Sequence, residues 1–208
     1  MRKELGNLNG APIREPKEGE EVVVLMDDFD PPTMSHVHAV ETLVAAGHCP
    51  IILCPMPVNR TSVGAGPAVG DADIRAMASI LCADLCSSKV QTWLCTVALD
   101  KGMRDPREVL KWLEENKKGV AFLPASVWPV DLIIERRFIQ IVFGGYSTSS
   151  KFAEPIAARK YLAVPLDIRS RIAAGMDESR NIPAPVWAYI QKKRLYRELF
   201  RDCREKAT

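Results

Sequence analysis

One segment, VVVLMDDFDPPTMSHVHAVETL from Val22 to Leu43, holds most of the residues that could do chemistry. A β-branched run ends in an acidic turn with two prolines, and the turn opens into a helix through Thr33, Ser35 and His36. A strand that leads into a helix N-terminus can form a phosphate site, because the helix offers unpaired N–H groups and the positive end of its dipole. Since His36 lies in the first turn, the segment predicts binding of a phosphate-bearing ligand.

Three residues of the same turn oppose this prediction. Met26, Asp27 and Asp28 occupy the place where a phosphate loop favours small, neutral side chains. Two carboxylates near a triphosphate repel it by roughly 1–4 kcal/mol per pair at effective dielectric constants of about 20 to 80. An alternative is that the two aspartates bind Mg²⁺, which prefers carboxylate oxygens. The turn therefore indicates either a working nucleotide site or the remains of one.

The candidate residues of this turn also have plain structural interpretations. Thr33 is a suitable helix N-cap whatever the ligand, and Asp30 fits a turn through its side chain. His36 could be a surface residue of the first turn, and His38 lies on another face of the helix. The sequence alone leaves these alternatives open.

The pattern of apolar residues predicts strands that alternate with helices. Strands are expected at 21–26, 50–56, 90–97, 119–124 and 138–143. Helices are expected at 33–47, from Asp71 or Asp73, from Asp105-Pro106 to Lys117, over 130–137, at 168–174 and at 185–204. This order predicts an α/β fold, a Rossmann-like doubly wound parallel sheet of about five strands with a helical C-terminal end. Ligands of such sheets bind at the carboxyl ends of the strands, where the 26–36 turn would lie.

Length and composition set modest bounds on domains, partners and location. We expect a polar N-terminal arm over 1–20 and one α/β domain over 21–208. A net charge of +2 gives no reason to expect nucleic acid as a partner, and no apolar run has the length of a membrane span. The N-terminus lacks an apolar signal core, which indicates an intracellular protein of the cytoplasm or an organelle matrix, with the mitochondrion as one option.

Most of the six cysteines lie in apolar stretches, and no CxxC pair is present. Cys82 and Cys86 are one helical turn apart on an expected core face, with no obvious further zinc ligands near them in the sequence. We therefore expect no metal site and reduced, buried cysteines that pack as small hydrophobes.

Two motifs at opposite ends of the chain resemble a known family. The run from Phe29 to His36, FDPPTMSH, matches the pattern GxFDPxTxGH of the nucleotidyltransferase superfamily. The run DIRSRIAAGMDESRNIPAPVWAYIQKKRLY at 167–196 resembles the closing segment of that family, and Arg75 resembles its arginine on the second helix. The resemblance is closest to the nicotinate/nicotinamide mononucleotide adenylyltransferases.

The resemblance implies an activity and a set of site residues. Such enzymes transfer AMP from ATP to the phosphate of a mononucleotide and release pyrophosphate, usually with Mg²⁺. By this resemblance His36 would donate to the developing phosphate charge, Thr33 would hydrogen-bond the phosphates and Arg169 would hold the β/γ end. Phe29, Asp30 and Ser35 would complete the nucleotide-binding turn.

The chain departs from the family pattern at three places. The paired glycines of the first motif fall at Met26-Asp27, and the motif SSTxIR corresponds to VPLDIR at 164–169, which keeps only Ile168 and Arg169. The family's Gly-x-Asp falls within LPAS at 123–126. The run STSSK at 147–151 could replace the lost hydroxyls. Arg169 itself could instead pair on the surface with Asp167 or Glu178.

These departures favour one of three hypotheses. The first choice is a catalytically impaired or inactive relative that is retained as a structural subunit of a larger intracellular assembly, since a core can outlast its active site. The alternative is an active adenylyltransferase of NAD biosynthesis that uses ATP and Mg²⁺. The third is a non-catalytic nucleotide-binding regulator that senses ATP or a dinucleotide without turnover. The partners expected of the chain are protein subunits and ATP or a mononucleotide.

Overall fold

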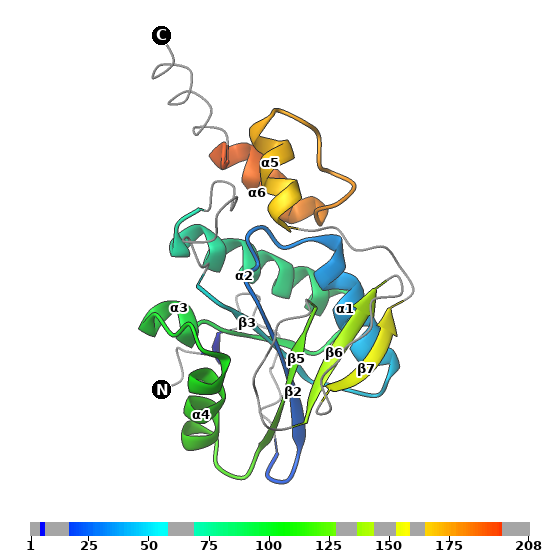
Figure 1. Ribbon diagram of the computed structural model, residues 1–208, viewed down its shortest axis with the longest axis vertical. Coiled ribbons are helices and arrows are strands. Elements are labelled where there is room, and N and C mark those ends of the chain that lie inside the picture. Colours follow the sequence, from blue (N-terminus) through cyan, green and yellow to red (C-terminus); the bar gives the residue numbers. More distant parts are fainter. Residues whose placement is uncertain are drawn as a thin grey trace.

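The computed structural model describes residues 5–6, 17–57, 69–127, 137–143, 153–158 and 165–196. Within these ranges the chain forms a seven-stranded sheet in the order β1-β4-β3-β2-β5-β6-β7 (Figure 1). The strands are β1 (Leu5–Gly6), β2 (Glu21–Asp27), β3 (Ile51–Pro55), β4 (Thr92–Cys95), β5 (Ala121–Ser126), β6 (Phe138–Phe143) and β7 (Ala153–Ala158). The helices are α1 (Met34–Ala45), α2 (Asp71–Ser87), α3 (Val97–Lys101), α4 (Pro106–Asn116), α5 (Pro165–Ala173) and α6 (Ala184–Lys193).

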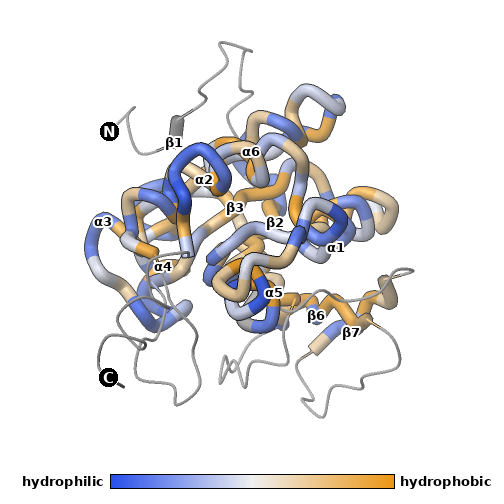
Figure 2. Tube along the Cα trace, turned by 90° about the horizontal axis from the view of Figure 1, so that it is seen from above, coloured by the Kyte–Doolittle hydropathy of each residue, from blue (hydrophilic) through white to orange (hydrophobic). Residues whose placement is uncertain are grey.

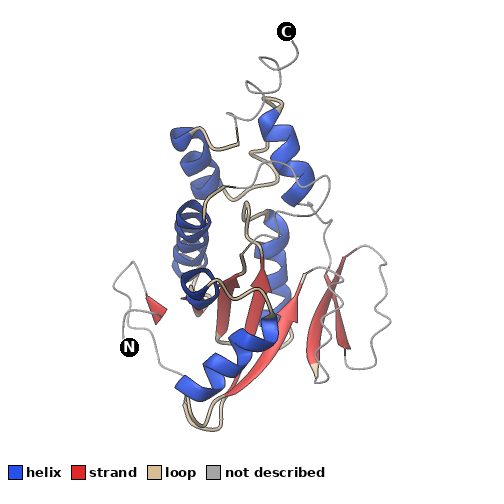
Figure 3. Cartoon of the chain, turned by 60° about the vertical axis from the view of Figure 1, so that its left-hand side comes forward, coloured by secondary structure: helices blue, strands red, loops and turns tan. Residues whose placement is uncertain are grey.

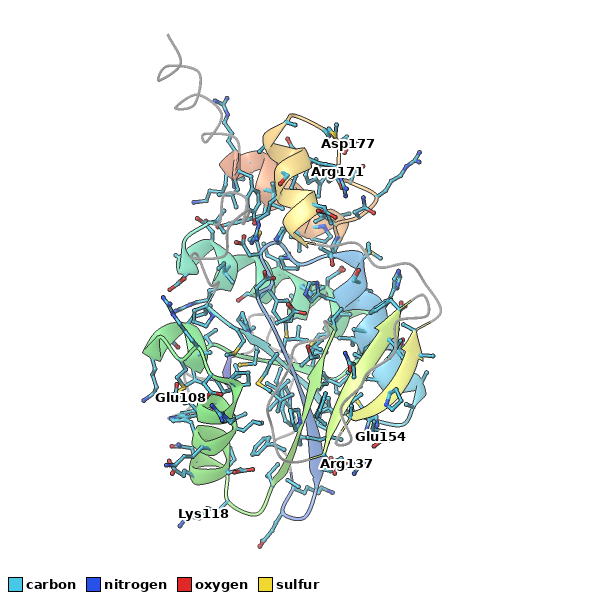
Figure 4. The ribbon with its side chains drawn as sticks, viewed as in Figure 1. Glu108, Lys118, Arg137, Glu154, Arg171 and Asp177 are labelled. Carbon is cyan, nitrogen blue, oxygen red and sulfur yellow. The ribbon has the colours of Figure 1, made fainter. Side chains whose placement is uncertain are left out.

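The sheet is parallel except at one edge. Strands β2 to β7 pair in parallel, whereas β1 pairs with β4 in the antiparallel sense. At the opposite edge, Arg137 forms an ion pair of 2.8 Å with Glu154, which joins the starts of β6 and β7 (Figure 4). The central strand β2 is buried along its length after Glu21, as its run of β-branched and apolar residues predicts.

Helices cover both faces of this sheet (Figure 3). One apolar cluster joins α1, α2, α5 and α6 to one set of strand residues, and the other joins α3 and α4 to the alternate set. Strands β3 and β6 are hydrophobic along most of their length (Figure 2), as burial on both faces requires. Helices α5 and α6 lie together at one end of the molecule (Figure 1).

The predicted α/β architecture is confirmed, with differences in the count and bounds of elements. The five expected strands are present as β2 to β6, while β1 and β7 were missed. Strand β1 has two residues, inside the predicted arm, and β7 carries Pro155 and little β-branched sequence. The strand expected over 90–97 ends at Cys95, where the chain turns into the short helix α3.

The helix starts mostly follow the local signals. Helix α4 begins at Pro106 with Asp105 as its N-cap, as predicted. Helix α2 begins at Asp71 with Gly70 as its N-cap, so neither predicted aspartate is the cap. Residues 130–136 of the helix expected over 130–137, and the part of 185–204 after residue 196, lie outside the described residues.

Five of the six cysteines lie in the described part of the chain. Cys54, Cys82 and Cys95 are buried, Cys86 is partly buried, and Cys49 is exposed; all five are free thiols. Cys82 packs in the apolar core, as expected, and its thiol also donates to the Thr92 carbonyl at 3.6 Å. No described helix is both long enough and apolar enough to cross a bilayer.

Candidate functional site

The predicted site residues of the first motif come together in one buried turn. Strand β2 ends at Asp27, Thr33 is the N-cap, and α1 begins at Met34. Phe29, Asp30, Thr33, Ser35 and His36 are all fully buried. The interpretation of His36 as a surface residue is therefore wrong.

His36 has a fixed orientation within this turn. The backbone N–H of Thr33 donates to Nδ1 of His36 at 2.9 Å, and the Thr33 hydroxyl lies 3.0 Å from the same nitrogen. The ring stacks on Phe29, with 4.5 Å between ring centroids, and Phe29 has the left-handed φ of 47°. Because Nδ1 accepts a hydrogen bond, the ring carries a proton on Nε2.

The free side of the His36 ring faces a carboxylate. Nε2 lies 3.6 Å from Oδ2 of Asp27, beyond hydrogen-bond distance. Both atoms are buried, and neither has a hydrogen-bond partner among the described residues. The site thus contains an unsatisfied donor and an unsatisfied acceptor side by side, an arrangement that most buried polar groups avoid.

Arg169 reaches the same turn from α5, 139 residues further along the chain. Its Nη1 donates to Oδ2 of Asp30 at 2.8 Å and to the Asp30 carbonyl at 3.0 Å. The same nitrogen lies 3.8 Å from Asp28, and Nε has no hydrogen-bond partner among the described residues. Arg169 is buried, so the interpretation as a surface ion pair with Asp167 or Glu178 is wrong.

Tyr196 completes the partners of Asp30. Its hydroxyl donates to Oδ1 of Asp30, and both side chains are buried. Burial raises the pKa of Asp30 above its ordinary value, while the hydrogen bond from Tyr196 and the charge of Arg169 act in the opposite direction. Burial and the Asp30 carboxylate raise the pKa of Tyr196 well above its ordinary value. The sequence placed Tyr196 only as the end of the closing motif, and its contact with Asp30 was missed.

The N-terminus of α1 is partly covered by the connection between α5 and α6. The Met34 N–H donates to the Asn181 carbonyl at 2.8 Å, so this helix N–H is not free for a ligand. Buried Glu178 holds the connection, since it accepts from Asn181 at 2.8 Å and from Arg171 at 2.6 Å. Arg171 lies on α5, within the C-terminal helical segment (Figure 4). Asn181 was missed, because no local signal in the sequence indicates its contact with α1.

The three residues that oppose a phosphate loop differ in position. Met26 lies in β2 and packs in the apolar core, so it does not obstruct the turn. The Asp27 side chain is 4% exposed and that of Asp28 is 32% exposed. Burial, with the nearby charges of Asp27 and Asp30, raises the pKa of Asp28 to about 7.

Other predicted residues lie away from this turn. Arg75 pairs with Asp100 at the protein surface. The segment LPAS at 123–126, which corresponds to the Gly-x-Asp motif, belongs to β5. The run at 147–151 lies outside the described residues. A groove of about 440 Å³ between α1 and β7 is lined by His38, Glu41, Thr42, Ala45, Ala46, Ile156 and Ala157, none of which belongs to the turn.

In the described part of the chain, no three His, Cys, Asp or Glu side chains come close enough together to hold a metal ion. Asp27 and Asp28 are adjacent, but Asp30 accepts hydrogen bonds from Arg169 and Tyr196. The described residues therefore do not form a ready-made Mg²⁺ cage.

The fold is shared with the nicotinic acid mononucleotide adenylyltransferase of Plasmodium falciparum. The structure of that protein complexed with NaAD matches with a TM-score of 0.70 at 16% identity, over 85% of this chain and 97% of that one. Its complex with APC gives a TM-score of 0.65 at 17% identity, with the same coverage. Identities this low show the fold alone, and the predicted Rossmann-like fold is confirmed.

A shorter match is found in sequence. A curated protein of Chlorobium phaeobacteroides (strain BS1), named "Probable nicotinate-nucleotide adenylyltransferase", is 38% identical over an 87-residue alignment. The alignment spans 36% of this chain and 44% of that protein, less than half of the relative's length. No family model matches the chain. The predicted resemblance to the nucleotidyltransferases, and among them to the nicotinate/nicotinamide mononucleotide adenylyltransferases, is confirmed.

Proposed function

We propose that the chain is an adenylyltransferase-like protein that does not transfer adenylyl groups and serves as a structural subunit of a larger assembly. This proposal rests on the partners of the groups that would face a phosphate, because each of them already lies against another group of the chain. His36 faces Asp27, Arg169 is paired with Asp30, and the Met34 N–H is taken by Asn181.

Adenylyl transfer makes specific demands on such groups. The α-phosphate gains charge in the transition state, and catalysis depends on preorganised donors aimed at it. In this chain the Arg169 donor Nη1 is already used by Asp30, and the His36 donor lies beside a carboxylate. Both features weaken the stabilisation of negative charge, which supports a non-catalytic role.

An active adenylyltransferase is the second candidate, and two observations favour it. The Nε2 donor of His36 is unpartnered among the described residues, and the sequence relative carries the name of a nicotinate-nucleotide adenylyltransferase. On this alternative ATP, with Mg²⁺ bound through its phosphates, would be the AMP donor for a mononucleotide. His36 would then act as a donor to the phosphate.

A pyrophosphate-release assay separates the two candidates. The purified chain is incubated with ATP, Mg²⁺ and either nicotinate or nicotinamide mononucleotide, beside His36→Ala and the matched control His38→Ala. His38 lies on the same helix, half-buried, and pairs with Glu41. We expect no turnover above background in all three proteins. Turnover by the wild type that falls at least a hundredfold in His36→Ala, but not in His38→Ala, would overturn the proposal.

The assembly is tested separately from the chemistry. Native mass spectrometry of the protein purified from its source cells is expected to give a mass above that of one chain, with other subunits bound. A purely monomeric mass would contradict the structural-subunit role. Imaging of the tagged protein tests the proposed intracellular location.

A further inference from the structure

Two carboxylates of this chain face the two side chains that a phosphate would need. Oδ2 of Asp27 lies 3.6 Å from Nε2 of His36, and Oδ2 of Asp28 lies 3.8 Å from Nη1 of Arg169. The Asp27 oxygen and the His36 nitrogen are buried and have no hydrogen-bond partner among the described residues. Asp27 therefore lies inside the donor site, whereas Asp28, whose side chain is 32% exposed, lies at its edge.

The distances limit where an anion could bind. An oxygen within hydrogen-bond distance of His36 Nε2, about 2.9 Å, lies at most about 6.5 Å from Oδ2 of Asp27. At that separation two unit charges repel enough to weaken binding about threefold at the dielectric of water, and about 70-fold at an effective dielectric of about 20. Each phosphate charge and each carboxylate adds a further contribution of this kind.

We propose that Asp27 and Asp28 are specificity-determining residues that exclude polyphosphates from the 27–36 turn. Removing their charges allows ATP to bind, whereas the affinity for an uncharged nucleoside does not depend on these charges. This inference rests on the proposed function, which treats the turn as derived from a nucleotide site.

The test compares ATP with adenosine, which lacks the phosphates. Both ligands are titrated calorimetrically into the wild type, Asp27→Asn, Asp28→Asn and the double variant, with and without Mg²⁺. The titrations are done at about pH 8.5, above the Asp28 pKa of about 7, so that both carboxylates of the wild type are charged. Asparagine keeps the oxygens that accept from the Asp28 and Asp30 N–H groups at 2.7 and 3.2 Å. Glu115→Gln, an exposed site on α4, is the matched control for the change in net charge.

We expect the double variant to bind ATP at least tenfold more tightly than the wild type, with each single variant between them. Adenosine affinity should change less than twofold, and Glu115→Gln should behave as the wild type. Equal ATP affinity in all proteins, or no ATP binding to any at millimolar concentration, would overturn the inference. ATP binding by the wild type that requires Mg²⁺ and is lost in the variants would also overturn it, because the carboxylates would then be metal ligands.

Two further controls separate a change in ATP affinity from a change in stability and from the test of the proposed function. Each variant is compared with the wild type by thermal unfolding, and Asp27→Ser replaces Asp27→Asn if the latter is less stable. Turnover by the wild type in the pyrophosphate assay would overturn both proposals, because it requires ATP at this turn. Equal ATP affinity in all variants without turnover would overturn the inference alone, and a purely monomeric native mass would contradict the proposed function alone.

Discussion

Two tyrosine–aspartate pairs join the C-terminal helical segment to the α/β body, and their surroundings differ. The hydroxyl of Tyr189 on α6 donates to Asp73 on α2 at 2.8 Å, with both side chains half-buried. The hydroxyl of Tyr196 donates to Asp30 in the first-motif turn, with both side chains buried. The same two residue types thus form one hydrogen bond near solvent and one in the interior of the molecule.

The inner pair, Tyr196 and Asp30, belongs to a buried charge network, whereas the outer pair, Tyr189 and Asp73, is half-buried. Asp30 also accepts from Arg169, so a buried cation depends on that carboxylate. Burial and Asp73 raise the pKa of Tyr189 to about 12, whereas the pKa of Tyr196 is raised well beyond its ordinary value. The residue types of a hydrogen-bonded pair therefore do not show how much the pair stabilises the fold. Its burial and its further partners decide that contribution.

The two pairs should differ most in their loss of unfolding free energy when the charge of the aspartate is removed. Asp30→Asn keeps an acceptor for Tyr196 but leaves Arg169 buried without its main counter-ion, which costs about 3 kcal/mol of unfolding free energy. Asp73→Asn at the outer pair should cost less than about 1 kcal/mol, because solvent replaces the lost interaction. Urea unfolding of both variants measures the two losses. Equal losses would mean that burial of the inner pair adds nothing.

Removing only the tyrosine hydroxyls should again destabilise the protein more at Tyr196 than at Tyr189, but the difference in unfolding free energy should be smaller. Tyr196→Phe removes a hydrogen bond to a buried carboxylate and is expected to cost about 2 kcal/mol. Tyr189→Phe is its matched control, and should cost about 0.5 kcal/mol. Thermal and urea unfolding of the two variants would contradict this if Tyr189→Phe were the more damaging change.

The same contrast explains what the sequence could predict. The strands β2 to β6 follow from runs of apolar residues, because burial on both faces leaves a local pattern. Strand β7, with Pro155 in a short alanine-rich segment, leaves no such pattern. The turn from Phe29 to His36 was predictable because its residues are contiguous. The contacts of Asp30 with Arg169 and Tyr196 span 139 and 166 residues, and only the folded chain defines them.

The smallest expected effect concerns Asp28, which is close to this inner network but has no hydrogen bond from Arg169. Its pKa of about 7 lies above the ordinary value of 3.8, so between these values the folded chain holds a proton that the unfolded chain has lost. The contribution of Asp28 to stability is therefore greatest below pH 4 and is lost as the pH rises through 7. Because a third of the side chain faces solvent, we expect a loss of only about 1 kcal/mol.

This pH effect is isolated by comparing the wild type with Asp28→Asn. Other carboxyl groups titrate over the same range in both proteins, so the difference between their unfolding free energies reports on Asp28. From pH 4.5 to pH 8 the wild type should lose about 1 kcal/mol relative to the variant. Glu115→Gln, on the exposed face of α4, should show no such trend. A constant difference would mean that Asp28 titrates in the folded chain as it does in the unfolded one. The inner network would then not extend beyond Asp30, Arg169 and Tyr196.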